Sequence, residues 1–492
     1  MRVRSVRVRN FRAFEDSGAL DLGAINVIVG PNNAGKSSLI RALALLQEGL
    51  PLGGGDVRLG TDASTISMEV EEIASPWPER LGGTVDINLS SQGGLGIELG
   101  GPSVARVGVN RFPNSEPTNF IYPFFSGRKV AAYEPSVTQN TTLAVGPDLR
   151  HLPAKLARLS NPDFPAHGRY REACEAVLGF VVTAIPAPNG QQAGVYVGTG
   201  GASIPMEAMG EGVANVVGLL VDLTLAQGKL FLVEEPENDI HPQALKALLD
   251  RVVESSSRNQ FVVSTHSHIV VRHLGSPSDA RVVYVESEGL PPIASIRALD
   301  STAERIEVLS DLGYDLWDFD LWAGWLILEE SSAERILRDL LIPWFAPQLA
   351  RVRTVSAGGQ SGVPPTFDDF NRLFRFTHLE ERYRDRAWVI VDGDAEGHRI
   401  VEQLRGRYTT WDPRQFRTWR EEDFEHYYPS PFAGRVATTL ALTGRAKREA
   451  KATLLTNVLD CSAADEQGAR DLWAESAAEV IEVLTEIERQ LI

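Results

Sequence analysis

Residues 30–37 have the spacing of a phosphate-binding loop: they read Gly-Pro-Asn-Asn-Ala-Gly-Lys-Ser, which matches GxxxxGK[ST]. The glycines let backbone N–H groups approach phosphates, and the start of a following helix adds positive potential. Within this loop Lys36 is placed to reach the β- and γ-phosphates, and the Ser37 hydroxyl is placed to bind Mg²⁺. The apolar run 24–29 predicts a buried strand before the loop, and the apolar spacing over 39–46 predicts a helix after it.

Two further apolar runs end in polar side chains that suit nucleotide hydrolysis. Residues 230–233 are followed by Glu234 and Glu235, and residues 261–265 are followed by His266. Carboxylates at the carboxyl end of a parallel strand lie at the ligand crevice of the sheet. We therefore expect Glu234 to hold the Mg²⁺ shell, Glu235 to polarise the attacking water and His266 to contact the γ-phosphate.

A second set of carboxylates follows two strands in the last third of the chain. The run 325–328 leads into Glu329-Glu330, and the run 387–391 leads into Asp392-Gly393-Asp394. Hard divalent cations prefer oxygen ligands, and a pair of such ions can stabilise the attacking and leaving oxygens of a phosphodiester. The sequence predicts a site for one or two Mg²⁺ ions, with Mn²⁺ as an alternative.

Helical spacing suggests one more ligand in this set. Glu334 follows Glu330 by four residues at the start of a predicted helix over 332–341, which would put both carboxylates on one helix face. The predicted metal ligands are thus Glu330, Glu334, Asp392 and Asp394. The alternative is that the two glutamates form a solvated helix start and that residues 392–394 form a turn.

Composition limits the class of protein. The chain has 492 residues, two cysteines that are far apart and a formal net charge of −17. It shows neither the apolar core of a signal peptide nor an apolar run of about 18 residues, so we expect a cytoplasmic protein without a membrane contact. An acidic protein is repelled by nucleic acid at long range, so DNA binding would need a local basic patch.

The stretch 370–420 is a candidate for such a patch. It interleaves arginines, which bind phosphate with two hydrogen bonds, with aromatic residues that could stack on bases. The alternative is a solvated face on which the arginines pair with nearby acidic residues. The arginines are Arg372, Arg375, Arg382, Arg384, Arg386, Arg399, Arg405, Arg407, Arg414, Arg417 and Arg420.

The pattern of elements indicates an α/β protein of several parts. Residues 50–115 are predicted to form β-structure, and residues 150–185 a helical insertion that could serve dimerisation. We predict an N-terminal domain over 1–305, a linker over 306–320, an α/β domain over 321–430 and a helical tail over 431–492.

The first of these domains resembles the ABC-type ATPase heads of the SMC, RecF and OLD (overcoming lysogenization defect) families. The resemblance is strongest over 7–42, and it implies that residues 30–38 bind ATP, with Asn32, Asn33, Ala34 and Ser38 beside Lys36. Residues 209–212 read Met-Gly-Glu-Gly where such heads carry a signature loop. The resemblance implies that Gly210 and Gly212 close on the nucleotide of a second protomer, so the active unit would be a homodimer or a larger homo-oligomer.

The α/β domain that follows resembles a Toprim domain, the metal-dependent fold of topoisomerases, primases and OLD nucleases. The resemblance implies that Glu330, Asp392 and Asp394 are catalytic metal ligands with Glu334 as an acidic partner. Residues 424–429 are similar to a segment that follows Toprim in OLD proteins, which implies Glu425 as a further ligand. Lys447 and Lys451 are the candidates for a catalytic lysine.

Together these resemblances imply an ABC/SMC-type P-loop ATPase head followed by a Toprim-like domain, as in OLD endonucleases, which include the nuclease subunit of the Gabija anti-phage system. The expected activity is ATP-regulated cleavage of DNA in antiviral defence, with a helicase-like or effector protein as a possible partner. One alternative is an ATPase sensor or scaffold with an inactive Toprim-like domain, which Ser331 in place of glycine favours. A second alternative is a RecF-like DNA repair ATPase.

Overall fold

The chain forms two compact units, Met1–Tyr314 and Asp315–Ile492. A computed structural model describes residues 1–51, 54–72, 77, 83–101, 104–126, 134–197, 201–313 and 322–491. Part of the predicted linker over 306–320 belongs to the first unit, because the helix α8 (Thr302–Asp311) extends into it. This helix begins at a capping box, in which the Ser301 and Glu304 side chains each accept the other's backbone N–H. The rest of that linker falls mostly outside the described residues.

The first unit is built on two large sheets. One has the strand order β16-β15-β4-β14-β13-β9, in which all neighbours except β15 and β16 run parallel. The other is antiparallel, with the order β2-β1-β5-β6-β7-β8 and β3 paired to β1. The bounds are β1 (Arg2–Phe11), β2 (Phe14–Asp16), β3 (Leu20–Asp21), β4 (Ile25–Val29), β5 (Ala63–Glu71), β6 (Thr84–Ser90), β7 (Leu95–Gly101), β8 (Val104–Val109), β9 (Ile121–Phe124), β13 (Leu230–Glu234), β14 (Gln260–Thr265), β15 (Arg281–Glu288) and β16 (Ile293–Ala298).

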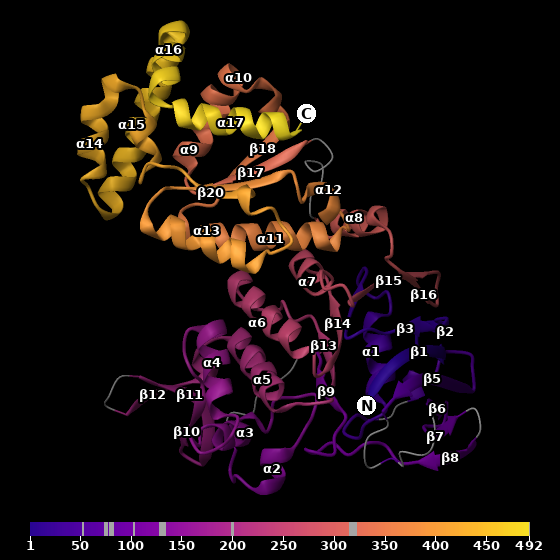
Figure 1. The fold of residues 1–492 in the computed structure, drawn as a ribbon. Coiled ribbons are helices and arrows are strands. Elements are labelled where there is room, and N and C mark those ends of the chain that lie inside the picture. Colours follow the sequence, from indigo (N-terminus) through magenta and orange to yellow (C-terminus); the bar gives the residue numbers. More distant parts are fainter. Residues whose placement is uncertain are drawn as a thin grey trace. The chain divides into compact units, whose positions relative to one another are not determined.

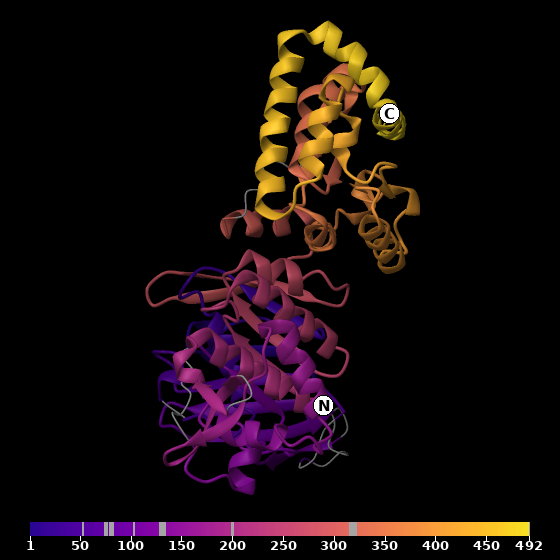
Figure 2. The same ribbon diagram turned by 90° about the vertical axis from the view of Figure 1, so that its left-hand side faces the viewer.

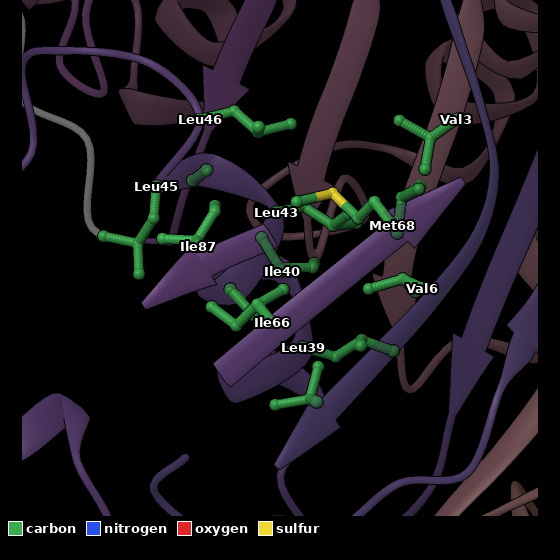
Figure 3. Packing of buried hydrophobic residues seen from close by; sticks show 14 of the residues in the cluster. Val3, Val6, Leu39, Ile40, Leu43, Leu45, Leu46, Ile66, Met68 and Ile87 are labelled. Carbon is green, nitrogen blue, oxygen red and sulfur yellow. The ribbon is translucent and has the colours of Figure 1, made fainter. Parts of the chain in front are cut away.

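The helix α1 (Lys36–Ala44) packs between these sheets, and it holds the loop before it in place. Its residues Leu39, Ile40 and Leu43 are fully buried and point toward Ile66 and Met68 of β5 (Figure 3). The strand β4 is buried at every position, as its nearly continuous apolar sequence predicts. The loop of residues 30–35 is therefore fixed at both ends by the core.

A helical lobe lies in the chain between β9 and β13, which are neighbouring strands at one edge of the parallel sheet. It contains a small sheet of β10 (Thr183–Ala187), β11 (Gly190–Val197) and β12 (Ala202–Pro205), and α5 leads from it back to β13 (Figure 1). The predicted insertion over 150–185 contains α3 and α4 together with the start of β10. Besides α1 and α8, the described α-helices of this unit are α2 (Gln139–Leu143), α3 (Leu152–Leu159), α4 (His167–Leu178), α5 (Glu211–Leu225), α6 (Pro242–Ser255) and α7 (His268–Leu274).

The second unit has a four-stranded parallel sheet in the order β18-β17-β19-β20. The chain leaves β17 toward β18 and later returns to the other side of β17 as β19. The carboxyl ends of β17 and β19 thus form the switch point of the sheet, where α/β folds place their ligand crevices. The bounds are β17 (Gly324–Leu328), β18 (Val352–Ser356), β19 (Ala387–Val391) and β20 (Phe416–Thr418).

Alternate side chains of these strands enter two hydrophobic cores, one on each face of the sheet. Leu326 and Ile390 pack with the C-terminal helices, whereas Ile327 and Val389 pack with α11 and α13. Figures 1 and 2 show these layers. The helices are α9 (Ser331–Ile336), a π-helical turn (Leu337–Leu341), α10 (Ile342–Phe345), α11 (Val363–Phe376), α12 (Glu380–Tyr383), α13 (Ala395–Arg407), α14 (Ala433–Leu440), α15 (Gly444–Ala464), α16 (Glu466–Ser476) and α17 (Ala478–Leu491).

The C-terminal region is helical, as predicted, but it shares its core with the preceding sheet. Trp473 of α16 is fully buried in the cluster that contains Leu326 and Ile390, and its indole N–H donates to Ser462 Oγ at 3.2 Å. Residues 431–492 are thus part of the second unit rather than a tail beside it. None of the described helices is both long and apolar enough to cross a membrane.

The shared core predicts a coupled loss of stability. We expect Trp473→Ala to lower the free energy of opening by about 3–5 kcal/mol, because it removes a fully buried aromatic side chain. Hydrogen–deuterium exchange should show the loss in β17 and β19 as well as in α15–α17. The control Leu472→Ala, at a side chain that is 37% exposed, should change protection little. Loss confined to residues 444–491 would contradict a shared core.

Candidate nucleotide and metal sites

The loop between β4 and α1 has the backbone of a phosphate cradle. Gly30 has a φ of 147°, and a Cβ atom there would lie 2.0 Å from the Val285 carbonyl oxygen, so only glycine fits. Gly35 caps α1 with a φ of 112°. The Lys36 ammonium donates to the carbonyl oxygens of Gly30 and Pro31 at 2.8 Å each. The Lys36 side chain therefore lies across the predicted phosphate-binding loop and contacts its first two residues.

The other residues predicted to contact ATP lie in or directly after this loop. Asn33 has a positive φ of 62°, Ala34 and Ser38 are buried, and Asn32 and Ser37 are exposed to solvent. The Ser38 backbone N–H donates to the Gly35 carbonyl at 3.0 Å, within the first turn of α1. Of the two serines, Ser37 is therefore the one whose hydroxyl is accessible to a ligand.

The predicted carboxylates lie at the carboxyl end of β13 beside this loop. Glu234 is buried and accepts hydrogen bonds from the Ser126 backbone N–H at 3.0 Å and from its hydroxyl at 3.3 Å. Glu235 has a φ of 46°, and its Oε1 lies 3.4 Å from His266 Nε2. The structure thus brings the predicted catalytic pair, Glu235 and His266, together.

Sequence reasoning missed Glu237 and Ser126. Glu237 Oε1 accepts from the Thr265 hydroxyl at 2.7 Å and from the His266 backbone N–H at 2.9 Å, so it ties the loop after β13 to the end of β14. Burial lowers the pKa of Lys36, although Glu235 and Glu237 act in the opposite direction. These acids therefore help the buried Lys36 to stay charged.

The glycines of the predicted signature loop lie at the start of α5. Gly210 caps the helix with a φ of 94°. A Cβ at Gly212 would meet the Asp239 carbonyl oxygen at 1.9 Å. Gly212 is thus required by packing within one chain, whatever it contributes to a second protomer.

A cluster of carboxylates lies at the switch point of the second unit. Oxygen atoms of Glu329, Glu330 and Asp392 all lie within 4.8 Å of one another. Glu329 and Asp392 are 5% exposed, and Glu329 Oε2 accepts from the Asp392 backbone N–H at 3.1 Å. Glu330 and Asp392 were predicted from the sequence, whereas Glu329 was not. Its position directly after a buried strand, like that of Asp392, was the signal for it.

Two predicted ligands lie outside this cluster. Glu334 Oε1 accepts from Thr354 at 2.6 Å and from Arg338 at 2.8 Å. The spacing argument that paired Glu334 with Glu330 was wrong, because Glu330 is the extended residue that caps α9 rather than a part of the helix. Asp394 caps α13 through the Gly397 backbone N–H at 2.7 Å and also accepts from the Gln360 amide at 2.6 Å.

Lys451 of α15 links the cluster to two more carboxylates. Its ammonium lies 2.9 Å from Glu330 Oε2, 2.9 Å from Glu425 Oε2 and 3.1 Å from Asp423 Oδ1. Asp423 also lies 3.2 Å from the Lys447 ammonium. Burial alone would lower the pKa of Lys451, but Glu425 and Glu330 raise it above its ordinary value. The lysine is therefore a permanent cation at neutral pH.

The raised pKa values of the carboxyl groups in this cluster fit a cation site. Burial, with Glu329 and Glu330 adding repulsion, raises the pKa of Asp392 to about 8. Burial, with help from Glu330, raises the pKa of Glu329 to about 7. Glu425 is fully buried, and its Oε1 has no hydrogen-bond donor among the described residues. These carboxylates therefore suit a divalent cation, which would satisfy oxygen atoms and compensate their charge.

Most of the aromatic residues of 370–420 are unsuited to the predicted DNA track, and many of its arginines pair with carboxylates. Phe374, Phe376, Trp411, Phe416 and Trp419 are buried and cannot stack on bases. The alternative of acidic pairing holds for the arginines whose ion pairs are given by the structure, namely Arg384, Arg399, Arg405, Arg407, Arg414, Arg417 and Arg420.

Comparisons with known proteins address the first unit. A family model described as "AAA ATPase domain" matches residues 1–72. A second, described as "AAA domain, putative AbiEii toxin, Type IV TA system", matches residues 101–272. These ranges contain the phosphate loop, Glu234, Glu235 and His266. The N-terminal unit carries an AAA-type ATPase domain.

Solved structures of SMC heads are similar to part of the chain. The SMC head domain from Thermotoga maritima is 16% identical, with a TM-score of 0.38, over 61% of this chain and 100% of that one. An SMC head bound to the C-terminal winged-helix domain of ScpA is 14% identical, with a TM-score of 0.42, over 61% and 98%. An SMC head with an extended coiled coil, bound to a ScpA domain from Pyrococcus furiosus, is 11% identical, with a TM-score of 0.42, over 63% and 99%. No curated protein matches the chain.

The ATPase domain predicts that two substitutions affect ATP binding and ATP hydrolysis differently. Lys36→Ala should abolish ATP binding, because it removes the cation of the phosphate loop. Glu235→Gln should retain ATP binding but slow hydrolysis by about 10²–10⁴-fold, because it would remove the group that is predicted to polarise the attacking water. Nucleotide-binding titrations and phosphate release would measure the two effects, with the exposed Glu254→Gln as a control. Near-normal hydrolysis by Glu235→Gln would contradict the assignment.

The raised carboxyl pKa values predict a pH-dependent metal site. Metal and protons compete for Asp392 and Glu329, so Mn²⁺ affinity measured by calorimetry should rise on the order of tenfold or more from about pH 6 to about pH 8.5. Without metal, the folded state binds more protons than the unfolded state, so stability should fall as pH rises toward 8. Asp392→Asn should weaken both trends, whereas the exposed Asp460→Asn should not. A pH-independent Mn²⁺ affinity would contradict the site.

Proposed function

We propose that the protein is a metal-dependent DNA endonuclease of the OLD type whose activity is regulated by its ATPase domain. The observation that carries the proposal is the cluster of Glu329, Glu330 and Asp392 at the switch point of a parallel sheet, with the Lys451 ammonium beside it. Buried carboxylates next to one buried lysine are a costly arrangement that a purely structural role does not require.

Each group has a defined task in this proposal. Mg²⁺ or Mn²⁺ would stabilise the charge on the attacking and leaving oxygens of a phosphodiester. Glu329, Glu330 and Asp392 would hold the cation, and Glu425 would complete its surroundings. Lys451 stays protonated, so its task would be to stabilise developing negative charge or to donate a proton, not to act as a base. Glu334 and Asp394 would position α9 and α13 rather than bind the ion.

The ATPase domain would act as the regulator. Lys36, Ser37 and Glu234 would bind ATP and Mg²⁺, and Glu235 with His266 would promote hydrolysis, while Gly210 and Gly212 would approach the nucleotide of a second protomer. Chemistry on DNA draws on the metal site, so slow hydrolysis would suffice for control. A role in antiviral defence, with an effector partner, is consistent with the toxin–antitoxin description of the matching family model.

A sensor or scaffold without nuclease activity is the second candidate. The observation that favours it is that Lys451 already satisfies Glu330 and Glu425 with a cation from the chain itself. In that case the second unit would not need a metal, and the ATPase domain would act through a separate effector.

Cleavage of plasmid and linear DNA by the purified protein distinguishes the two candidates. We expect cutting with Mg²⁺ or Mn²⁺, and a loss of at least about 10²-fold in Asp392→Asn and Glu329→Gln, because an incomplete ligand set cannot hold the ion. The exposed Asp460→Asn is the matched control. Lys36→Ala, tested with and without ATP, shows whether nucleotide activates or restrains cutting.

The sensor candidate makes the opposite prediction. Wild-type protein would hydrolyse ATP but cut no DNA under any metal condition, and Glu329→Gln would leave Mn²⁺ binding unchanged. That outcome would reject the nuclease and direct the search to a partner protein.

A further inference from the structure

The start of α15 carries positive charge where helices usually carry negative charge. Arg445, Lys447, Arg448 and Lys451 lie within its first eight residues, and its first turn contains no acidic residue. The macrodipole gives a helix N-terminus a partial positive charge, so cations there are unfavourable. A local rule that is broken in this way is typical of a functional surface.

Three of these side chains form a row along the helix. Arg445, Arg448 and Lys451 are three residues apart, so each lies next to the following one on the helix surface. The Arg445 side chain is 88% exposed, Arg448 is exposed, and the Lys451 side chain is 10% exposed. The row thus leads from solvent to the carboxylate cluster.

The exposed end of the row is available to a ligand. The only carboxylate partner of Arg445 among the described residues is Glu449, in a pair whose side chains are 88% and 65% exposed, and such pairs contribute little. Arg448 has no ion pair or hydrogen-bonded side-chain partner among the described residues. The arginines of 384–420 named above differ from Arg448, because each lies next to a carboxylate.

The inner end of the row fixes α15 against the cluster. Lys451 and Lys447, which are one helical turn apart, both bind Asp423 Oδ1, and Lys451 also contacts Glu330. A phosphate bound at Arg448 would therefore be held beside the metal ligands through one rigid helix. The net charge of −17 makes such a local row necessary if the chain binds a polyanion.

We infer that the row Arg445–Arg448–Lys451 is the track on which the DNA backbone approaches the carboxylate cluster. This inference rests on the proposed nuclease function and adds the surface that holds the substrate. The row contacts phosphates and not base edges, so binding is independent of sequence and strongly dependent on salt.

The test is the anisotropy of a fluorescent DNA duplex titrated with full-length protein, with Ca²⁺ in place of Mg²⁺ and over a series of salt concentrations. We expect Arg445→Gln/Arg448→Gln to weaken binding on the order of tenfold or more, and to reduce the slope of log affinity against log salt by about 2. Glu449→Gln should tighten binding, because it removes a negative charge beside the row and so reduces repulsion of the DNA phosphates. The matched control is Arg399→Gln, at a 65% exposed arginine paired with Glu396, and it should leave binding unchanged.

Cleavage kinetics give a second readout. The arginine variants should raise KM and leave kcat nearly unchanged, because they remove binding that the ground and transition states share. Wild-type binding and salt slope in the double variant, or equal weakening by Arg399→Gln, would overturn the track. If the double arginine variant binds DNA like the wild type and wild-type protein still cuts DNA, the track is wrong but the nuclease proposal stands. If wild-type protein neither binds nor cuts DNA, both fail.

Discussion

Negative charge buried where β17 and β19 end is the constraint on which the second unit depends. Adjacent parallel strands bring their carboxyl ends together, so the first residues after them, Glu329 and Asp392, lie close to each other. Removing a carboxylate from water without compensation costs several kcal/mol. The positive charge must come from elsewhere in the chain, and α15 supplies it as Lys451.

The ATPase domain has the opposite arrangement of charge at the same kind of sheet edge. Its ligand is an anion, so backbone N–H groups, the start of α1 and Lys36 face the crevice, and Glu234 and Glu235 stand beside them. In the second unit carboxylates face the crevice and a lysine stands beside them. Both sites use the one place where a parallel sheet gathers polar groups from separate segments.

The sequence predicted features that depend on neighbouring residues. The phosphate loop, the strands before Glu234 and Asp392 and the helical character of the C-terminal region all follow from local patterns. Contacts between distant segments were not predictable in this way. Lys451 is 121 residues from Glu330, and only the fold shows that the two meet. Glu334 and Asp394 were predicted as ligands from short-range patterns, but in the fold Glu334 binds Thr354 and Arg338, and Asp394 caps α13.

The charge balance of the cluster bears on whether Lys451 replaces a metal ion or acts beside one. Glu329, Glu330, Asp392, Asp423 and Glu425 are five carboxylates, and Lys447 with Lys451 gives two cations, so five minus two leaves three negative charges when all are ionised. Burial and mutual repulsion raise the pKa values of Asp392 and Glu329, so without a metal ion these carboxyl groups retain protons more readily, which reduces the excess charge. A divalent cation would take the place of those protons and leave the lysine pairs intact. In the proposed function the metal ion would therefore act beside the lysine and not be replaced by it, because the lysine alone leaves the carboxylates under-compensated.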